Sequence, residues 1–354
     1  MDVKREKKRS LMGPARKTVF IIAVFQAVAY FYALAQQPGV LPRPLPAPKL
    51  WMVLIGEYAS ATDTLYIAED NAQLLLVTKK PQRFPLNLIS GLTYSFPGGD
   101  MFHDSVVVFK RSTSGSVSEL QIGSTSFKRL MLGGEHESSF SITPLKPIAE
   151  LRKIALASFP PVEKGNFLPV DLVELSFLDR EIKYDIRYAT TNNFLSEPVY
   201  SQAKAFLQRP AARGLLSAQR WLKERGYGLL IHDAYRPWYV TKIFWDATPE
   251  DKKMFVADPT KGSRHNRGCA VDCSLYDLKT GKPLEMTGGY DEMSERSYPA
   301  FPGGTSLQRW HRDLLRKAME SNGFAVYDWE WWHFDYKDWK KYPIGTKTFE
   351  EISR

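Results

Sequence analysis

The segment SRHNRGCAVD, residues 263–272, places a histidine and an aspartate seven positions apart. His265 and Asp272 suit a loop that turns into a strand, because Gly268 between them lets the backbone bend. An imidazole nitrogen and a carboxylate oxygen together form a donor pair that suits zinc. The segment is therefore a candidate for part of a zinc site, although a histidine and an aspartate at this spacing also occur by chance.

A second segment, EWWHF at residues 330–334, offers a third donor, His333, and a further carboxylate, Glu330. On a regular strand these two side chains would face opposite sides of the sheet, so we expect an irregularity between them. A catalytic zinc has three protein ligands and an open position, with a nearby carboxylate that is not a ligand. His265, Asp272 and His333 make such a ligand set, and Glu330 is then the nearby carboxylate that is not a ligand. The alternative, a Trp-rich edge strand with an incidental histidine, is outweighed once the first segment is present.

A third segment, IHDAYRP at residues 231–237, follows an apolar run that predicts a buried strand at 227–231. Arg236 is therefore expected where a strand opens into a loop. A fixed guanidinium near a metal can bind a carbonyl oxygen that becomes an oxyanion. The alternative is that Arg236 pairs with Asp233 and only pins the turn, and the spacing leaves both interpretations open.

In this order, the three segments resemble the D-alanyl-D-alanine dipeptidases, the VanX-type branch of the M15 zinc peptidases. The pattern S-x-H-x-x-G-x-A-x-D is met by residues 263–272, E-W-W-H by residues 330–333, and D-x-Y-R-P by residues 233–237. The resemblance covers about residues 170–345. It implies an α+β zinc D,D-peptidase fold with a mixed or antiparallel sheet, one zinc ion per chain, and hydrolysis of the dipeptide D-alanyl-D-alanine to two D-alanines.

The resemblance also implies the roles of the residues that carry the chemistry. The zinc ligands would be His265, Asp272 and His333. Glu330 would be the general base, and Arg236 would stabilise the oxyanion.

Substrate contacts follow from the same resemblance. Asp291 would pair with the free ammonium of the dipeptide, which explains how such a site can demand a free amino end. Ser263, Tyr188 and Phe244 fall where the family places further contacts, although the two aromatic residues could instead be plain core. The chain departs from the family in its export signal, in an added β-domain, and in Asn192, where a carboxylate is common. The first two departures bear on the biological substrate rather than on the chemistry.

The N-terminus has the pattern of an export signal. Residues 1–17 hold seven basic side chains against two acidic ones, which is more than half of the net charge of +9. An apolar run at residues 19–35 ends in Ala-Leu-Ala, which is typical of a secretory signal peptide, here cleaved after Ala35. The alternative is an uncleaved anchor, since the run reaches the lower limit for a membrane span. In both cases the rest of the chain lies outside the cytoplasm, in the periplasm or secreted, and its small remaining charge gives no reason to expect a nucleic-acid partner.

The rest of the chain divides by composition. Residues 36–49 are Pro-rich and predict an extended linker. Residues 50–142 carry short apolar runs between turn residues (WMVLIG, TLYIAED, AQLLLVT, VVVFK and ELQIGS), which predict the strands of a small all-β barrel or sandwich, an accessory domain that could contact the cell wall. A connector at residues 143–169 leads to the dipeptidase domain at residues 170–354. Helices are expected at residues 148–157, 203–225 and 307–320.

Two other functions stay open. A D,D-carboxypeptidase or endopeptidase acting on peptidoglycan peptides would use the same zinc set without the amino-end clamp at Asp291. A non-catalytic wall-binding module would hold a structural zinc closed by a fourth ligand, for which Cys269 and Cys273 are the candidates nearby. On a strand both cysteines would point away from Asp272 and lie too far apart for a disulfide, so we expect them to be small core hydrophobes.

Overall fold

The part of the chain whose structure is described excludes the N-terminal residues 1–41, four short internal gaps and the last residue. The computed structural model describes residues 42–80, 82–98, 102, 105–130 and 141–353. The predicted signal peptide or anchor at residues 1–35 lies outside these ranges. Within them, no helix is both long and apolar enough to cross a membrane. Residues 44–354 form one compact unit, and the predicted division of this unit into domains stays a prediction.

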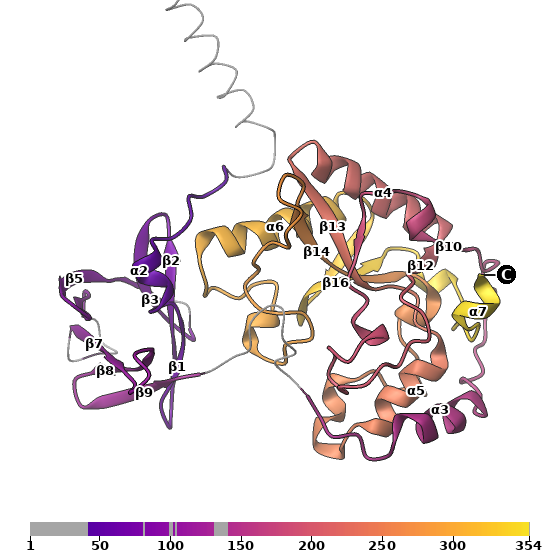
Figure 1. The fold of residues 1–354 in the computed structure, drawn as a ribbon, viewed down its shortest axis with the longest axis horizontal. Coiled ribbons are helices and arrows are strands. Elements are labelled where there is room, and N and C mark those ends of the chain that lie inside the picture. The colour runs from indigo at the N-terminus through magenta and orange to yellow at the C-terminus, as the bar shows by residue number, and fades with distance from the viewer. Residues whose placement is uncertain (1–41, 81, 99–101, 103–104, 131–140, 354) are drawn as a thin grey trace, which may run out of the picture. The chain divides into compact units, whose positions relative to one another are not determined.

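Among the described residues from Gly56 to Arg129, which we call the β-region, nine strands form one antiparallel sheet (Figure 1). The strand order is β4-β3-β2-β1-β9-β8-β7-β6-β5, so β4 and β5 are the two edges. Leu86 alone separates these two edge strands in the chain, so the sheet curls until its edges meet there, as in a barrel. The strands are β1 (Gly56–Ala59), β2 (Thr64–Asp70), β3 (Gln73–Thr78), β4 (Arg83–Pro85), β5 (Asn87–Ser90), β6 (Thr93–Ser95), β7 (Val106–Arg111), β8 (Val117–Ile122) and β9 (Thr125–Arg129).

Strand β2 is buried on both of its faces. Leu65 and Ile67 point into a core cluster that also contains Phe109 of β7. The alternate residue Tyr66 lies on the opposite face, in a second cluster with Phe301 from far along the chain. The continuous apolar run of β2 therefore reflects two cores rather than one.

In residues 141–353, which are described without a gap, five strands form a mixed sheet in the order β11-β13-β14-β16-β15. Strand β11 runs parallel to β13, and the other neighbours are antiparallel. Helices α4 and α6 pack together against this sheet (Figure 1). The expected mixed α and β fold is therefore confirmed. The strands are β10 (Leu172–Glu174), β11 (Lys183–Tyr184), β12 (Phe206–Gln208), β13 (Tyr227–Asp233), β14 (Ala270–Asp277), β15 (Phe324–Tyr327) and β16 (Glu330–Tyr336). The helices are α3 (Ile148–Leu156), α4 (Arg209–Lys223), α5 (Trp238–Ala247), α6 (Ser306–Glu320) and α7 (Phe349–Ile352), with 3-10 turns η1 (Leu175–Phe177), η2 (Arg187–Ala189), η3 (Glu250–Phe255), η4 (His265–Arg267), η5 (Glu295–Ser297) and η6 (Trp339–Lys341).

Two expected elements differ in position from the structure. The strand expected at residues 51–56 is replaced at its start by a short helix, α2 (Lys49–Met52), and β1 begins at Gly56. The helix expected from residue 203 begins at Arg209, because Phe206–Gln208 is strand β12, paired with β10. In both places a proline decides the boundary, since proline suits the first turn of a helix and favours extended backbone before it. Pro48 precedes α2, and Pro210 lies in the first turn of α4.

Strand register places three acidic or imidazole side chains in one row across the central sheet. Asp233 of β13 pairs with Asp272 of β14, which pairs with His333 of β16. Directly paired residues point to the same face of a sheet, so this row faces one side. On the far side of β16 the register slips: Val326 pairs with Phe334, and the next residue, Tyr327, pairs with Glu330. The expected irregularity between residues 330 and 333 is confirmed.

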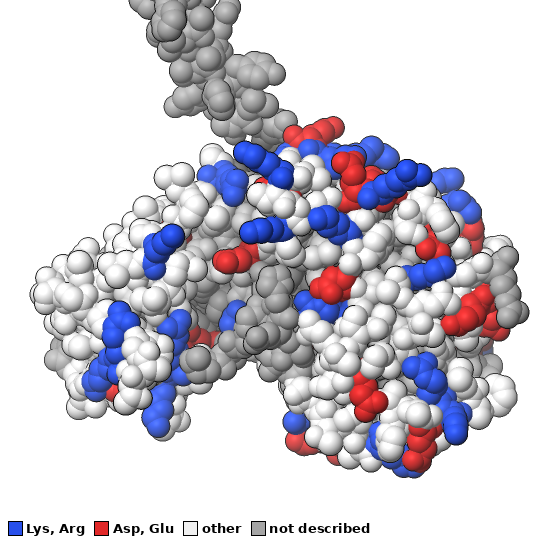
Figure 2. Space-filling model, viewed as in Figure 1, with Lys and Arg blue, Asp and Glu red and all other residues white. Residues whose placement is uncertain are grey.

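Charged side chains on the surface are mixed in sign. Over much of the face seen in Figure 2, Lys and Arg lie among Asp and Glu. Ion pairs among the described residues include Arg209–Asp171 at 2.6 Å and Arg316–Glu320 at 2.8 Å. Where opposite charges lie side by side in this way, the surface creates no large single-sign field, whereas the β-region in the same view carries mostly Lys and Arg.

Candidate metal centre and substrate pocket

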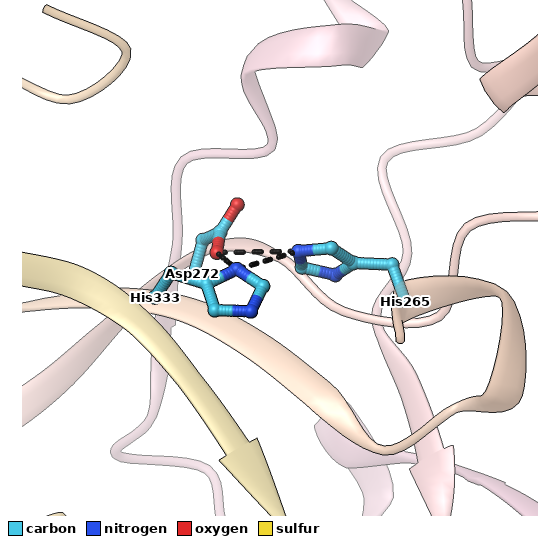
Figure 3. Close-up of side chains that lie close together, drawn as sticks. All are labelled: His265, Asp272 and His333. Carbon is cyan, nitrogen blue, oxygen red and sulfur yellow. Dashed lines mark hydrogen bonds and ion pairs between the residues drawn. The ribbon is translucent and has the colours of Figure 1, made fainter. Parts of the chain in front are cut away.

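The three predicted zinc ligands converge on one point (Figure 3). His265 begins the 3-10 turn η4, Asp272 lies in β14 and His333 in β16, and all three are buried. His265 Nε2 lies 3.1 Å from His333 Nδ1 and 3.3 Å from Asp272 Oδ1. His333 Nδ1 lies 3.0 Å from the same carboxylate oxygen. Gly268, at φ +65°, makes the left-handed turn that separates the first two ligands, as its position in the motif predicted.

The second nitrogen of each imidazole is held by an acceptor. His265 Nδ1 lies 2.7 Å from the carbonyl oxygen of Ala234, and His333 Nε2 lies 3.0 Å from Asp335 Oδ1. Carbonyl and carboxylate oxygens only accept, so these nitrogens carry the protons. His265 Nε2, His333 Nδ1 and Asp272 Oδ1 are then three acceptors that face one another. Three converging acceptors repel one another unless a cation lies between them, and this outer hydrogen bonding is typical of metal-binding histidines.

The size of the triangle fits zinc. Zinc binds imidazole nitrogen and carboxylate oxygen at about 2.0–2.2 Å in tetrahedral sites, which places two ligand atoms about 3.3–3.6 Å apart. The three separations here are 3.0, 3.1 and 3.3 Å. Cys269 and Cys273 are both free and buried, and neither belongs to this group of described residues. The expected absence of a bond between them is confirmed, and a site closed by a cysteine loses its support.

The electrostatics of the triangle also call for a positive charge. Burial alone would lower the pKa of His333, but hydrogen bonds to Asp272 and Asp335 outweigh it and raise this pKa to about 10. Burial would raise the pKa of Asp272, yet His265 and His333 hold it well below its usual range. Without a metal, a proton on His333 therefore balances the carboxylate, and a divalent cation would displace it.

Glu330 lies beside the triangle, as predicted for a base. Its Oε2 atom is 3.8 Å from His333 Nδ1, and the slipped register at β16 is what turns both side chains to one side. Burial raises the pKa of Glu330 above its ordinary value, although His333 opposes the shift. The side chain keeps 30% of its surface exposed, so solvent can reach it.

Arg236 makes the pair with Asp233 that was one of its two interpretations from the sequence, and its oxyanion role stays a prediction. Its Nε and Nη2 atoms donate to Asp233 Oδ2 at 3.0 and 2.7 Å, which is the turn-pinning pair. Its Cζ atom also lies 5.2 Å from the ring centre of Tyr188 and 4.9 Å from that of Phe244. A guanidinium has five N–H donors, so the pair with Asp233 orients the group without using up its donors. The side chain is only 9% exposed.

Asp291 is a buried carboxyl held by Tyr188. The hydroxyl of Tyr188 donates to Asp291 Oδ2 at 2.9 Å, and the rings of Tyr188 and Phe244 lie 4.7 Å apart. Burial and the nearby charge of Asp272 raise the pKa of Asp291 to about 7, against the lowering effect of the Tyr188 hydrogen bond. Its backbone has φ +57°, a conformation that is uncommon for a residue other than glycine. The predicted contact residues Asp291, Tyr188, Phe244 and Arg236 thus form one connected group.

Ser263 forms hydrogen bonds within the turn that contains His265, a candidate metal ligand. Its Oγ accepts from the backbone N–H of His265 at 3.3 Å, and its own N–H donates to Asn266 Oδ1 at 2.7 Å. These bonds give Ser263 a positioning role for His265. Its contact with substrate stays a prediction.

Two residues of the site have no place in the sequence-based predictions. Asp335 holds the outer nitrogen of His333, and Tyr290 donates its hydroxyl to Asp272 Oδ2 at 3.0 Å. Asp335 could have been found, because it follows His333 by two positions on a strand and shares its face. Tyr290 is next to Asp291 in the chain, but nothing local links it to a carboxylate 18 positions away.

Comparison with known proteins agrees with the geometry. A family model described as D-ala-D-ala dipeptidase, peptidase M15, matches residues 169–351. The chain belongs to this family. A protein of Escherichia coli K12 named D-alanyl-D-alanine dipeptidase is 34% identical over 179 residues, which cover 51% of this chain and 91% of that protein. Proteins of the same name from Enterococcus faecalis V583 and Enterococcus faecium are 37% and 34% identical over 180 and 195 residues, covering 46% and 48% of this chain and 89% and 95% of theirs. A solved structure titled "Crystal structure of SurE" covers 27% of this chain and 22% of its own, with a TM-score of 0.20 and 22% identity, too low a likeness to inform the fold.

The family match spans every residue of the candidate site and begins after the β-region. Tyr188 is the first site residue along the chain and Asp335 the last, and both lie inside residues 169–351. Membership in a peptidase family therefore applies to the part of the chain that holds the metal ligands.

The raised pKa of Asp291 predicts that this carboxyl destabilises the metal-free protein at neutral and alkaline pH. The unfolded chain ionises Asp291 near pH 4, whereas the folded protein keeps it protonated up to about pH 7. Stability is therefore lost as the pH rises between these values. In metal-free protein, Asp291→Asn should raise the free energy of unfolding by up to about 4 kcal/mol at pH 8, and by less at pH 5.

Thermal unfolding at both pH values measures this effect. Asp328→Asn, which removes an exposed carboxyl, is the matched control and should leave the melting temperature nearly unchanged. A variant at position 291 that is less stable than the parent at pH 8 would contradict the raised pKa.

Proposed function

We propose that the chain is an exported zinc dipeptidase that hydrolyses D-alanyl-D-alanine to two D-alanines. The observation that carries this proposal is the triangle of three buried acceptors with Glu330 Oε2 3.8 Å from one of them. The name shared by the relatives from Escherichia and Enterococcus supports the choice of substrate. Export rests on the sequence pattern of residues 1–35, and contact of the β-region with the cell wall rests on that location.

The chain supplies a base and an oxyanion donor for this reaction. Zinc held by His265, Asp272 and His333 would supply the Lewis-acid chemistry that makes water nucleophilic near neutral pH. Glu330 takes the proton of the attacking water and delivers it to the leaving amine. The raised pKa of Glu330 suits these two steps, because the carboxyl must hold the proton between the first transfer and the second. Arg236 directs N–H donors at the carbonyl oxygen while Asp233 keeps the guanidinium in place.

Substrate selection would depend on Asp291. A carboxyl that is 8% exposed is costly to ionise, and the free ammonium of a dipeptide can supply the missing positive charge. Tyr188 and Phe244, 3% and 2% exposed, would form the aromatic wall behind that pair, and Ser263 would complete the pocket. A D,D-carboxypeptidase or endopeptidase would instead bind an acylated amine, which leaves Asp291 without a cation.

The first prediction concerns the metal. The purified protein should contain about one zinc per chain, and His333→Ala should lose the metal, because one nitrogen donor of the triangle is removed. His311→Ala is the matched control, since His311 is a buried histidine of α6 outside the triangle. Elemental analysis measures both. Stoichiometric zinc in His333→Ala would refute the ligand set.

A second prediction separates the base from the ligands. Glu330→Gln keeps the volume of the side chain but cannot accept a proton, so the variant should retain zinc and lose about 10²–10⁴-fold in kcat. Zinc content and rate are measured on the same sample. A rate within threefold of the parent at full zinc occupancy would exclude Glu330 as the base.

The third prediction tests the function itself. D-Ala-D-Ala should be cleaved, and N-acetyl-D-Ala-D-Ala should be cleaved far more slowly, because acetylation removes the cation that Asp291 requires. Sites built around a polar partner reject analogues lacking it by about 10⁴-fold or more. Product analysis with and without a chelator measures both substrates. Comparable kcat/KM values for the two would favour the wall-peptide carboxypeptidase.

A further inference from the structure

The segment that carries Asp291 is in contact with the β-region, which lies outside the residues that match the family. We call residues 286–305, between β14 and α6, the clamp loop. We propose that strands β2 and β3 of the β-region position the clamp loop, and thereby set how strongly the site selects a free amino end. This inference rests on the proposed function for its kinetic consequence, although the contacts themselves do not depend on it.

The first contact is an aromatic insertion. Phe301 of the clamp loop, 5% exposed, packs in a cluster with Tyr66 and Ala68 of β2 and Leu75 and Val77 of β3. The rings of Phe301 and Tyr66 meet edge to face with centres 5.2 Å apart. Aromatic pairs in this geometry contribute beyond the area they bury. The face of β2 and β3 that lies away from the core of the β-region is therefore occupied by the loop.

A buried carboxylate fixes the C-terminal end of the loop. Glu69 of β2 is 1% exposed, and its oxygens accept from the backbone N–H of Ser306 at 2.9 Å and from the Ser306 hydroxyl at 2.7 Å. Ser306 is the first residue of α6, where a negative charge is favourable. The backbone N–H of Glu69 also donates to the carbonyl oxygen of Gly304 at 3.0 Å, and Ala68 forms a parallel bridge with the same glycine. The backbone at Gly304 therefore pairs with β2 in the way that a neighbouring strand of the sheet would.

The middle of the loop is held at Glu295. Its carboxylate accepts from the hydroxyl of Tyr66 and pairs with Lys79 Nζ at 2.9 Å. The lysine is 62% exposed, so the tyrosine makes the better-protected bond. Tyr66 therefore acts twice, through its ring on Phe301 and through its hydroxyl on Glu295.

Hydrogen bonds inside the loop carry this support toward Asp291. Glu292, next to Asp291 and 1% exposed, accepts from the backbone N–H of Gly289 at 2.8 Å and pairs with Arg296 Nε at 3.2 Å. Arg296 Nε also donates to the carbonyl oxygen of Thr287 at 3.0 Å. These bonds join the parts of the clamp loop before and after Asp291. Movement of the loop's outer half at Glu295 would consequently displace its inner half.

The β-region is an addition to the family fold. The family match begins at residue 169, and alignments of 179 to 195 residues cover 89–95% of three relatives. Those relatives have too little remaining chain for nine further strands. Their equivalent of the clamp loop must be held by other means, whereas in this chain it rests on Tyr66 and Glu69.

A matched pair of variants tests the proposal. Tyr66→Phe and Tyr58→Phe each remove one tyrosine hydroxyl from neighbouring strands of the β-region. The first hydroxyl bonds Glu295 of the clamp loop, and the second bonds the carbonyl oxygen of Leu54 at 2.7 Å, away from the loop. Glu69→Gln is the second test variant, because it keeps the volume but removes the charge at Ser306.

Two measurements are made on zinc-loaded full-length protein. Tyr66→Phe and Glu69→Gln should speed amide hydrogen exchange in residues 286–297 and raise KM for D-Ala-D-Ala about threefold or more. They should leave kcat within about twofold, because an ammonium held equally in ground and transition states affects KM alone. The preference for the free over the acetylated dipeptide should fall by the same factor as KM rises. Tyr58→Phe should change neither exchange in this segment nor KM.

Each outcome decides between the alternatives. A loss of folded protein alone would lower kcat and leave KM unchanged, which would overturn the positioning role. Unchanged exchange in both test variants, or an equal effect of Tyr58→Phe, would also overturn it. Faster exchange with unchanged KM would overturn the link to selectivity. If the parent protein cleaves no D-Ala-D-Ala, the proposed function fails, and faster exchange in the test variants alone would still support the loop contact.

Discussion

The site depends on the pairing register of three strands. Asp233, Asp272 and His333 face one another directly across β13, β14 and β16. A slip of one residue would turn Asp272 or His333 to the opposite face of the sheet. The row gives the metal triangle two of its ligands, and through Asp233 it also holds Arg236, which enters from the loop after β13. The third ligand, His265, needs only a short turn to reach the row, and Gly268 provides it.

Charge balance explains why the site is built at a cost to stability. Asp272 has two imidazoles beside it, but Asp291 and Glu330 lack an equal compensation, and burial raises the pKa of both. Each carboxyl matches a positive charge that the proposed reaction brings. In that reaction Asp272 would meet the metal, Asp291 the ammonium of the substrate, and Glu330 the proton of the attacking water. Buried carboxyls without a cation lower the stability of the protein when metal and substrate are absent. The same carboxyls are already in place to bind these cations.

The spacing and order of the motifs predicted the three candidate metal ligands that the structure brings together. They also predicted an irregularity in β16, because Glu330 and His333 had to share a side. The prediction from sequence misjudged the start of α4, where apolar spacing in residues 203–208 imitates a helix before Pro210. It could not show that Tyr66 reaches Phe301 or that Glu69 reaches Ser306, since such partners are over 200 positions apart. The unbroken apolar runs of β2 and β3 are the local sign that a second surface covers these strands.

Occupation of β2 and β3 by the clamp loop limits what the β-region can do elsewhere. A sheet face that buries Phe301 and a carboxylate such as Glu69 is not available to an external ligand. The predicted contact with the cell wall must therefore use other strands, such as β5, whose four residues are all exposed. Wall binding at β5 and support of Asp291 at β2 and β3 would then involve different strands of one curled sheet. On this proposal the added region would act as part of the peptidase rather than as a spacer before it, because removing its contacts would alter the loop that carries Asp291.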